Sequence, residues 1–357
     1  MSRSLKRVLQ EALQVSQRVL RRFSNRFSPH KFTQPQLFAC LVMKEFLGQD
    51  YRTAARLLAD SPDLQKWIGL AHPPHYTTLH KASKRLLRAE RAHRLLQAEL
   101  ARGRRLGLLR PRVETAAIDG TGLLAQAASH HFRAQQEAEN AGKHRPRRAT
   151  RRRRWPKLMV ACDCGSHLIV AMQVERGPAS DTRRFLPLAC DLYDEARPRV
   201  LVCDAGFDAE WIHTACRDLL DIRSLIPAKS RGSGRGPPRG KRRRWMASHL
   251  EQTRYHARSQ VETVFSMLKR RLRDTLHARK PWAQHRAASL KVLVHNLLIL
   301  ARYRLGFLQS HANRDGAVDL ADFGALKTHF GASKHRQILR LCRKHRAGIG
   351  LLRGCES

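Results

Sequence analysis

The pattern of the chain changes near Arg112, and this change limits the folds that the chain can adopt. Up to about residue 110, apolar residues recur at helical spacing, as in Leu5, Val8 and Leu9. Beyond that point, short apolar segments have the length and composition of strands and alternate with helical segments. Strands that alternate with helices build a mixed α/β sheet. We therefore predict an all-helical region over 1–110, followed by an α/β core.

Capping and turn residues divide the helical region into separate helices. Thr33 is a predicted N-cap for a helix over 34–47, shorter helices are expected over 51–58 and 63–68, and a basic helix is expected over 78–100. A short helix, a turn and a basic helix form the outline of a helix-turn-helix, whose second helix enters the major groove. A solvated basic helix is the alternative interpretation. The candidate DNA-binding residues here are Lys81, Lys84 and Arg85.

Two strands of the α/β region carry an aspartate at their ends. The segment 113–119 is a predicted strand that ends in Asp119, and a buried-type strand over 199–206 ends in Asp204. Ligand sites of open sheets form at the carboxyl ends of adjacent strands, so we expect these two carboxylates to face each other. Aspartate before glycine is also ordinary turn chemistry, so each residue alone has a structural explanation.

Other elements complete the predicted core. They are a hairpin over 158–174, a helix near 182 with Asp181 as its N-cap, a helix near 208, a short strand over 223–227 and a mostly apolar helix over 289–303.

A helix predicted over 252–276 carries a carboxylate flanked by two cations and a phenol. Its four polar residues, separated by gaps of two, three and six, are Tyr255, Arg258, Glu262 and Lys269. At about 100° per residue, the four side chains lie within about 60° of one another on a helix. A carboxylate among cations suits a site that handles phosphate and a metal ion together. The alternative is a solvated helix with an ordinary i, i+4 ion pair.

Asp119, Asp204 and Glu262 together predict a site for hard divalent cations. Three carboxylates without a cation repel one another, and this disfavours their ionised forms. Mg²⁺ prefers a few carboxylates together with water and phosphate oxygens. Two such ions would activate a nucleophile and stabilise the leaving oxygen of a phosphodiester.

The charge of the chain indicates a polyanionic partner. The sequence has 69 Lys plus Arg against 29 Asp plus Glu, a formal net charge of +40, and nucleic acid is the obvious polyanion. Two stretches, 143–154 and 229–244, hold eight Lys or Arg each. We expect both to be flexible alone and to contact nucleic-acid backbone, with solvated loops as the alternative. Trp155 and Trp245 border them and are candidates for base stacking or for packing.

Membrane and disulfide proteins are disfavoured. No apolar run approaches 18 residues, and the N-terminus lacks the apolar segment of a secretory signal. The eight cysteines are scattered, so we interpret them as small core residues in a reducing cytoplasm rather than as zinc ligands.

Three blocks resemble the DDE transposases of the bacterial insertion-sequence superfamily, whose helix signature is Tyr, Arg, Glu and Lys at these spacings. IleAspGlyThrGly at 118–122 resembles the block around that family's first Asp. The segment 202–209 resembles the second block, with Phe207 where Tyr is usual. The segment 255–269 matches the third block without a departure. The resemblance covers about 112–300 well, and the segments 51–57 and 75–86 also resemble this family's N-terminal part.

The resemblance implies a ribonuclease-H-like catalytic core and cut-and-paste DNA transposition that depends on two Mg²⁺ ions, for which Mn²⁺ can substitute. Water would first cut at the transposon end and expose a 3′-hydroxyl, which would then attack target DNA. The implied partners are double-stranded DNA and a second copy of the chain, in a bacterial cytoplasm and associated with the nucleoid. By carry-over, the catalytic metal ligands are Asp119, Asp204 and Glu262, and the phosphate contacts are Tyr255, Arg258 and Lys269.

The resemblance also divides the chain into three parts. A helical DNA-binding region over 1–110 precedes a ribonuclease-H-like core over 111–305, and a basic tail follows over 306–357. Asp204 and Glu262 are 58 positions apart (262 minus 204), which leaves no room for the β-rich insertion of some superfamily members. The chain therefore resembles a compact member.

Two other functions remain open. A catalytically inactive or domesticated transposase would keep the charge and fold and would only bind DNA. Another ribonuclease-H-like nuclease, such as a junction resolvase, would cleave DNA without strand transfer.

Overall fold

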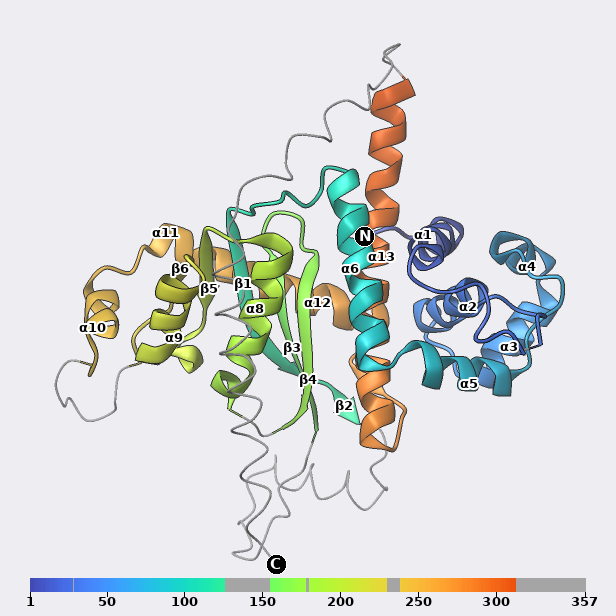
Figure 1. Cartoon of the computed structure of the whole chain (residues 1–357), viewed down its shortest axis with the longest axis horizontal. Helices are drawn as coiled ribbons and strands as arrows, with labels where there is room; N and C mark the ends of the chain where they lie inside the picture. The colour runs from blue at the N-terminus through green and yellow to red at the C-terminus, as the bar shows by residue number, and fades with distance from the viewer. Residues whose placement is uncertain (28, 126–154, 178–179, 230–237, 313–357) are drawn as a thin grey trace, which may run out of the picture.

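The computed structural model describes residues 1–27, 29–125, 155–177, 180–229 and 238–312. Figure 1 shows their arrangement. The α-helices are α1 (Leu5–Gln17), α2 (Gln34–Phe46), α3 (Tyr51–Asp60), α4 (Pro62–Ile68), α5 (Tyr76–Leu86), α6 (Ala89–Arg105), α8 (Phe185–Ala196), α9 (Glu210–Thr214), α10 (Lys241–Ser248), α11 (Gln252–Tyr255), α12 (Ser259–Leu272) and α13 (Pro281–Ala312). The strands are β1 (Thr115–Gly122), β2 (Leu124–Ala125), β3 (Pro156–Asp163), β4 (Ile169–Arg176), β5 (Val200–Cys203), β6 (Arg223–Leu225) and β7 (Thr275–Leu276).

A five-stranded mixed sheet forms the centre of the α/β region, with the strand order β4-β3-β1-β5-β6. Strands β4, β3 and β1 are antiparallel neighbours, whereas β1, β5 and β6 run parallel. Strands β2 and β7 form a separate parallel pair. The prediction of a mixed α/β core is confirmed, and so is the hairpin over 158–174, which is the β3–β4 pair.

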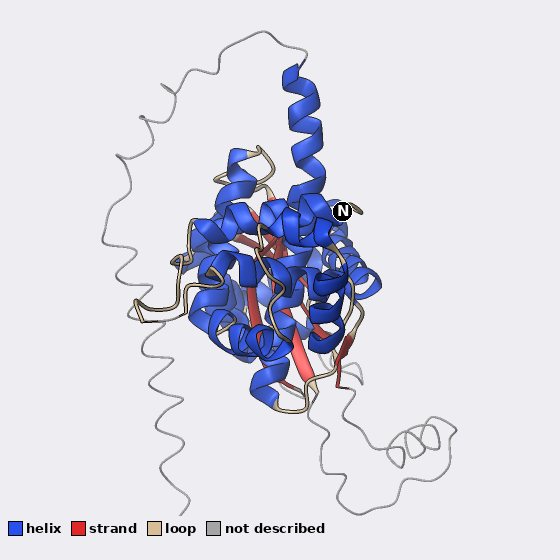
Figure 2. Cartoon of the chain, turned by 90° about the vertical axis from the view of Figure 1, so that its right-hand side faces the viewer, coloured by secondary structure: helices blue, strands red, loops and turns tan. Residues whose placement is uncertain are grey.

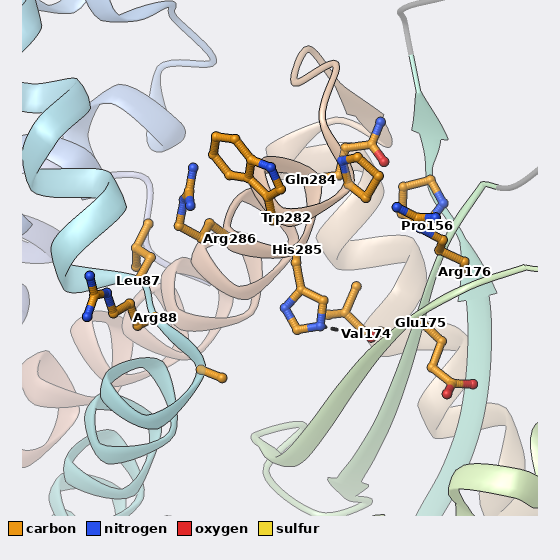
Figure 3. A pocket seen from close by; sticks show the side chains of 12 residues that line it. Leu87, Arg88, Pro156, Val174, Glu175, Arg176, Trp282, Gln284, His285 and Arg286 are labelled. Atoms are coloured by element: carbon orange, nitrogen blue, oxygen red, sulfur yellow. Dashed lines mark hydrogen bonds between the residues drawn. The ribbon is translucent and has the colours of Figure 1, made fainter. Parts of the chain in front are cut away.

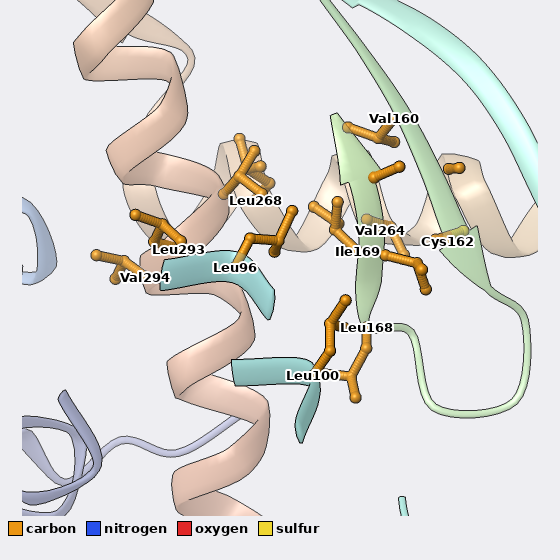
Figure 4. Close-up of a cluster of buried hydrophobic side chains, with 14 of the residues drawn as sticks. Leu96, Leu100, Val160, Cys162, Leu168, Ile169, Val264, Leu268, Leu293 and Val294 are labelled. Carbon is orange, nitrogen blue, oxygen red and sulfur yellow. The ribbon is translucent and has the colours of Figure 1, made fainter. Parts of the chain in front are cut away.

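Helices cover both faces of this sheet. Helix α8 lies in front of it in Figure 1 and packs on β3 and β4, whereas α12 lies behind it. Figure 4 shows where α6, α12 and α13 meet β3 and β4. Buried side chains from each element interdigitate there, among them Leu96, Val160, Ile169, Val264 and Leu293. Because this layer is closely packed, it fixes α12 against the sheet, where α12 also contacts β1, the strand that carries Asp119.

Helices α1 to α5 lie on the side of α13 that faces away from the sheet, and α1, α2 and α5 pack on it (Figure 1). Figure 2 views the molecule from that side and shows the strands behind a layer of helices. The predicted start of α2 is confirmed: the Gln36 N–H donates to the Thr33 hydroxyl at 3.3 Å, and the Thr33 N–H donates to the Gln36 side chain at 2.8 Å. One hydrophobic cluster runs without a break from α1 to the sheet.

Two predicted elements have different limits from those expected. The basic helix over 78–100 is wrong as a single helix, because the backbone turns extended at Arg88 and separates α5 from α6 while Leu87 is buried. The strand expected to end at Asp119 continues to Gly122, because β3 still pairs with it there. No helix in the described parts of the chain is both long and apolar enough to cross a bilayer.

Candidate active site

Asp119 and Asp204 follow the last paired residues of two parallel strands. The last pair in the β1–β5 register joins Ile118 to Cys203; Asp119 is the next residue of β1, and Asp204 is the first residue after β5. Besides burial, the Asp204 charge raises the pKa of Asp119, as expected for two carboxylates close together at the same end of the sheet. Asp119 Oδ1 accepts the N–H of Gly120 at 2.7 Å, and Asp204 Oδ1 accepts the N–H of Gly206 at 2.9 Å. The structure thus brings these two predicted site residues together.

The surroundings of Asp119 disfavour the ionised form of its carboxyl group. Burial raises its pKa to about 6, and the Asp204 charge adds to this rise, whereas the Gly120 N–H and Arg258 lower it. Two partly buried carboxylates side by side favour a proton or a cation between them. The pair is therefore suited in its chemistry to bind a cation.

The helix predicted over 252–276 is not continuous. Helix α11 ends at Tyr255, a 3₁₀ turn covers His256–Arg258, and α12 carries Glu262 and Lys269. Periodicity in the sequence does not separate one 3₁₀ turn from one α turn, because their spacings differ by less than a residue. The helix then ends at Leu272, before Arg273, which has a positive φ of 64°.

Arg258 lies between the two acidic elements of the site. Its guanidinium donates to Glu262 Oε1 at 2.6 Å and lies 3.9 Å from Asp119 Oδ2. Burial alone lowers the pKa of Arg258, but Glu262, Tyr255 and Asp119 outweigh burial and raise it. Arg258 is therefore a permanent cation that ties the signature segment to β1.

The other two signature residues flank this centre. Burial raises the pKa of the Tyr255 phenol, Arg258 lowers it, and the charges of Asp204 and Glu262 raise it further, which places Tyr255 beside both carboxylates. Lys269 is half-buried and follows Glu262 by two turns on the same face of α12. The structure thus gathers Tyr255, Arg258 and Glu262 around the aspartates, with Lys269 further along the helix.

The donor types suit a divalent metal ion, but Arg258 holds the third carboxylate in this conformation. Glu262 is 55% exposed and its oxygen is hydrogen-bonded to Arg258. Within the residues that the structure describes, no three His, Cys, Asp or Glu side chains lie close enough together to hold a metal ion. In this conformation Arg258 is the cation beside Asp119.

An ion pair that sequence reasoning missed borders the site. Asp181 does not cap a helix as predicted, because Ser180 precedes the 3₁₀ turn and the Asp181 carboxylate pairs with Lys157. Both side chains press on Gly120: a Cβ there would lie 2.9 Å from Lys157 Cε and 3.3 Å from Asp181 Oδ1. The Asp181 charge also contributes to the raised pKa of Asp119. No sequence pattern links the two partners, which come together only through the sheet.

The predicted DNA contacts outside the site differ in exposure. Lys81 and Lys84 are exposed on α5, whereas Arg85 is half-buried and burial lowers its pKa. Trp155 is 41% exposed. Trp245 is 40% exposed and stacks on its own neighbour, His249, at 4.8 Å between ring centroids.

The two basic stretches fare differently. The stretch 143–154 lies outside the described residues. Part of 229–244 forms the start of α10, so the prediction that it is flexible is wrong there. Arg242 pairs with Asp218 at 2.6 Å, and Arg243 forms a buried pair with Asp208. These arginines neutralise acids of the protein itself.

Comparison with known proteins gives one family. A family model described as "Transposase DDE domain" matches residues 113–297, more than half of the chain. The match begins just before β1 and includes Asp119, Asp204 and Glu262. No curated protein matches the chain.

Proposed function

The chain belongs to the transposase DDE domain family, and from this premise we propose that it cuts DNA at transposon ends and joins them to target DNA. The observation that carries the proposal is that Asp119 and Asp204 directly follow the last residue pair of the parallel strands β1 and β5, with Arg258 bridging from Asp119 to Glu262. The mixed strand order, with Asp119 on the central strand, supports a ribonuclease-H-like core.

Members of the family generally use divalent metal ions, and Asp119, Asp204 and Glu262 are the residues that would hold Mg²⁺ or, in its place, Mn²⁺. Bound ions activate the attacking oxygen and stabilise the leaving oxygen of the phosphodiester. The raised pKa of Asp119 supports this assignment, because a cation beside it would relieve the repulsion from Asp204. Since Glu262 is largely exposed, its carboxylate can exchange Arg258 for another cation without disturbing the core.

Three side chains of the signature would position DNA. Arg258, Tyr255 and Lys269 would hold phosphates at the transposon end; the place of Arg258 and Tyr255 at the carboxylates, and of Lys269 two turns beyond Glu262 on the same face of α12, supports this role. The region 1–110 would bind end DNA through Lys81, Lys84 and Arg85, 111–305 would carry the chemistry, and 306–357 would form a basic tail. Two copies acting on two ends, in the bacterial cytoplasm and on the nucleoid, complete the proposal.

Cleavage of a labelled duplex that carries the inverted repeat flanking the gene tests this function. The wild type should nick the repeat boundary in Mg²⁺, but neither in Ca²⁺ nor without metal, and Glu262→Ala should not nick. Glu114→Ala is the matched control, because Glu114 is an exposed acid just before β1 and its loss should change nothing.

Other outcomes lead to other functions. Specific binding without nicking in any metal would indicate an inactive, transposase-derived DNA-binding protein. Nicking without strand transfer would indicate a nuclease such as a junction resolvase.

A further inference from the structure

Three cations surround the exposed indole of Trp282 at the start of α13. The Arg286 guanidinium lies 4.4 Å from the ring centroid, Lys280 Nζ lies 5.7 Å away and Lys84 Nζ 6.0 Å. Lys84 belongs to α5, so the N-terminal helices and α13 build this group together. We call these four residues the Trp282 cluster.

None of the three cations has a carboxylate partner within the described part of the chain. The acids that line the adjoining cavities are engaged elsewhere. Glu45 pairs with Lys291 at 2.6 Å, Asp50 accepts the N–H of Thr53 at 2.7 Å, and Glu175 pairs with an arginine. The cluster therefore carries an excess of positive charge that the protein leaves unmatched.

Two cations of the cluster affect the same neighbouring histidine. Burial lowers the pKa of His80, and the charges of Lys84 and Arg286 lower it further. Burial also lowers the pKa of Arg286 itself. Like charges held together cost free energy, and cation–π contact with the indole offsets only part of that cost. An anion bound to the cluster would offset the rest.

Two cavities adjoin Trp282 and Arg286, which line both. One, of about 500 Å³, lies between the start of α13, the end of β4 and the α5–α6 junction, and Figure 3 shows Arg286 beside Trp282 in its wall. The other, of about 520 Å³, lies between α2, α3, α5 and the α12–α13 connection. Cations line each of them: Arg88 and Arg176 the first, Arg273 and Arg279 the second. The positive surface is thus longer than the cluster itself, as a polyanion requires.

The cluster lies at the end of the sheet that also carries the catalytic residues. Arg176 at the end of β4 pairs with Pro156 at the start of β3, and the next residue of β3 pairs with Gly122 of β1. Gly122 follows Asp119 by three residues. DNA that reaches the carboxylates can therefore extend towards the cluster along the same edge of the molecule.

We propose that the Trp282 cluster binds the phosphate backbone of the DNA substrate outside the active site. This proposal rests on the proposed function, because it assigns a second contact surface to the same substrate. The cations contact phosphates and the indole holds them in place, so the surface gives affinity and register without reading sequence. Neutralising the cluster should lower both the affinity for DNA and the dependence of that affinity on salt concentration.

The test compares two triple variants of the full chain that lose the same charge. The first is Lys84→Gln with Lys280→Gln and Arg286→Gln. The control is Arg18→Gln with Arg56→Gln and Lys66→Gln, which are exposed cations of the N-terminal helices without ring contacts. Binding of a labelled duplex of mixed sequence is measured by anisotropy over a range of salt concentrations. The Lys84→Gln, Lys280→Gln double variant, which leaves half-buried Arg286 in place, guards against misfolding of the first triple.

The cluster triple should lower the slope of log affinity against log salt by about 2 to 3, at about 0.9 for each phosphate that is no longer neutralised. The double variant should lower it by about 2, and the control should leave it nearly unchanged. Equal effects of cluster and control variants on duplex binding would overturn the proposal. Binding of labelled polyglutamate is measured in the same way. If the cluster triple loses polyglutamate binding but keeps duplex binding, the proposal is also overturned, because that result would indicate an acidic protein partner. If the wild type binds no duplex at all, the proposed function itself fails.

Discussion

The active site and the Trp282 cluster have opposite imbalances of charge. At the active site, Asp119, Asp204 and Glu262 share one close cation, Arg258. At the Trp282 cluster, three cations share an indole and no carboxylate pairs with them among the described residues. Elsewhere, as in the buried pair of Arg243 with Asp208, the protein neutralises its own charges.

This difference separates two tasks on one substrate. The acidic site is suited to attract cations and perform chemistry, whereas the basic cluster is suited to hold phosphates and performs none. Substitutions in one region should therefore leave the measured property of the other unchanged.

The largest expected effect comes from Asp204→Asn. Losing this carboxylate should lower the cleavage rate by about 10,000-fold, or about 5 kcal/mol of transition-state stabilisation, because it removes a charge at the reacting phosphate. Duplex affinity should change by no more than about twofold, since the cluster is intact. The cluster triple should show the reverse pattern in the same single-turnover cleavage and anisotropy assays. A large loss of duplex affinity in Asp204→Asn would contradict the separation of the two regions, because it would make the active site a main contributor to DNA binding.

The second effect concerns the joint between the regions. Lys291 Nζ pairs with Glu45 in the wall of the cavity of about 520 Å³ that adjoins the Trp282 cluster. It also donates to the Leu272 carbonyl at the end of α12. Both side chains are less than 10% exposed. Lys291→Met should therefore lower the free energy of unfolding by about 3–5 kcal/mol, as for a broken buried pair. Denaturant unfolding measures it, and the Glu45→Met, Lys291→Met double variant should recover most of the loss.

A third prediction concerns the pH dependence of stability caused by the buried His295, which lies outside the active site. Burial lowers the pKa of His295 to about 4, so the unfolded chain binds its proton first, near pH 6.5. Its contribution to stability is full above pH 6.5 and falls by about 3 kcal/mol as the pH drops to 4. Burial raises the pKa of Glu99, which gives the opposite slope. The difference in unfolding free energy between wild type and His295→Gln therefore isolates the histidine, and a difference independent of pH would contradict it.

The smallest effect is expected from Arg258. Arg258→Ala removes the guanidinium that is proposed to hold a phosphate, a loss of about 2 kcal/mol for a charged hydrogen bond, or about 30-fold in cleavage rate. Arg258→Lys should recover part of this, because charge is kept but the forked geometry is not. If the lysine variant is as slow as the alanine variant, geometry rather than charge is the contribution of Arg258.

The sequence predicted the parts of the fold and site that depend on local patterns. The positions of Asp119 and Asp204 near the carboxyl ends of two predicted strands indicated that they lie together, although β1 continues past Asp119 to Gly122, and Thr33 marked the start of α2. The break at His256–Arg258 escaped prediction, because its spacing is nearly helical. The start of α10 is ordered by Asp208, Glu210 and Asp218, which are distant in sequence. The Trp282 cluster joins residues about 200 positions apart, and no periodicity describes such a contact.

Helix α13 has a mechanical consequence for this arrangement. Its 32 residues make a rod about 48 Å long. Trp282 and Arg286 occupy its first turns, and Lys291 follows Arg286 by five residues, about 7.5 Å along the axis. The rod is clamped by the core on all sides at that level. A force on DNA bound at the proposed Trp282 cluster would therefore act through the first turns of α13 on the hydrogen bond from Lys291 to the Leu272 carbonyl, at the end of the helix that carries Glu262.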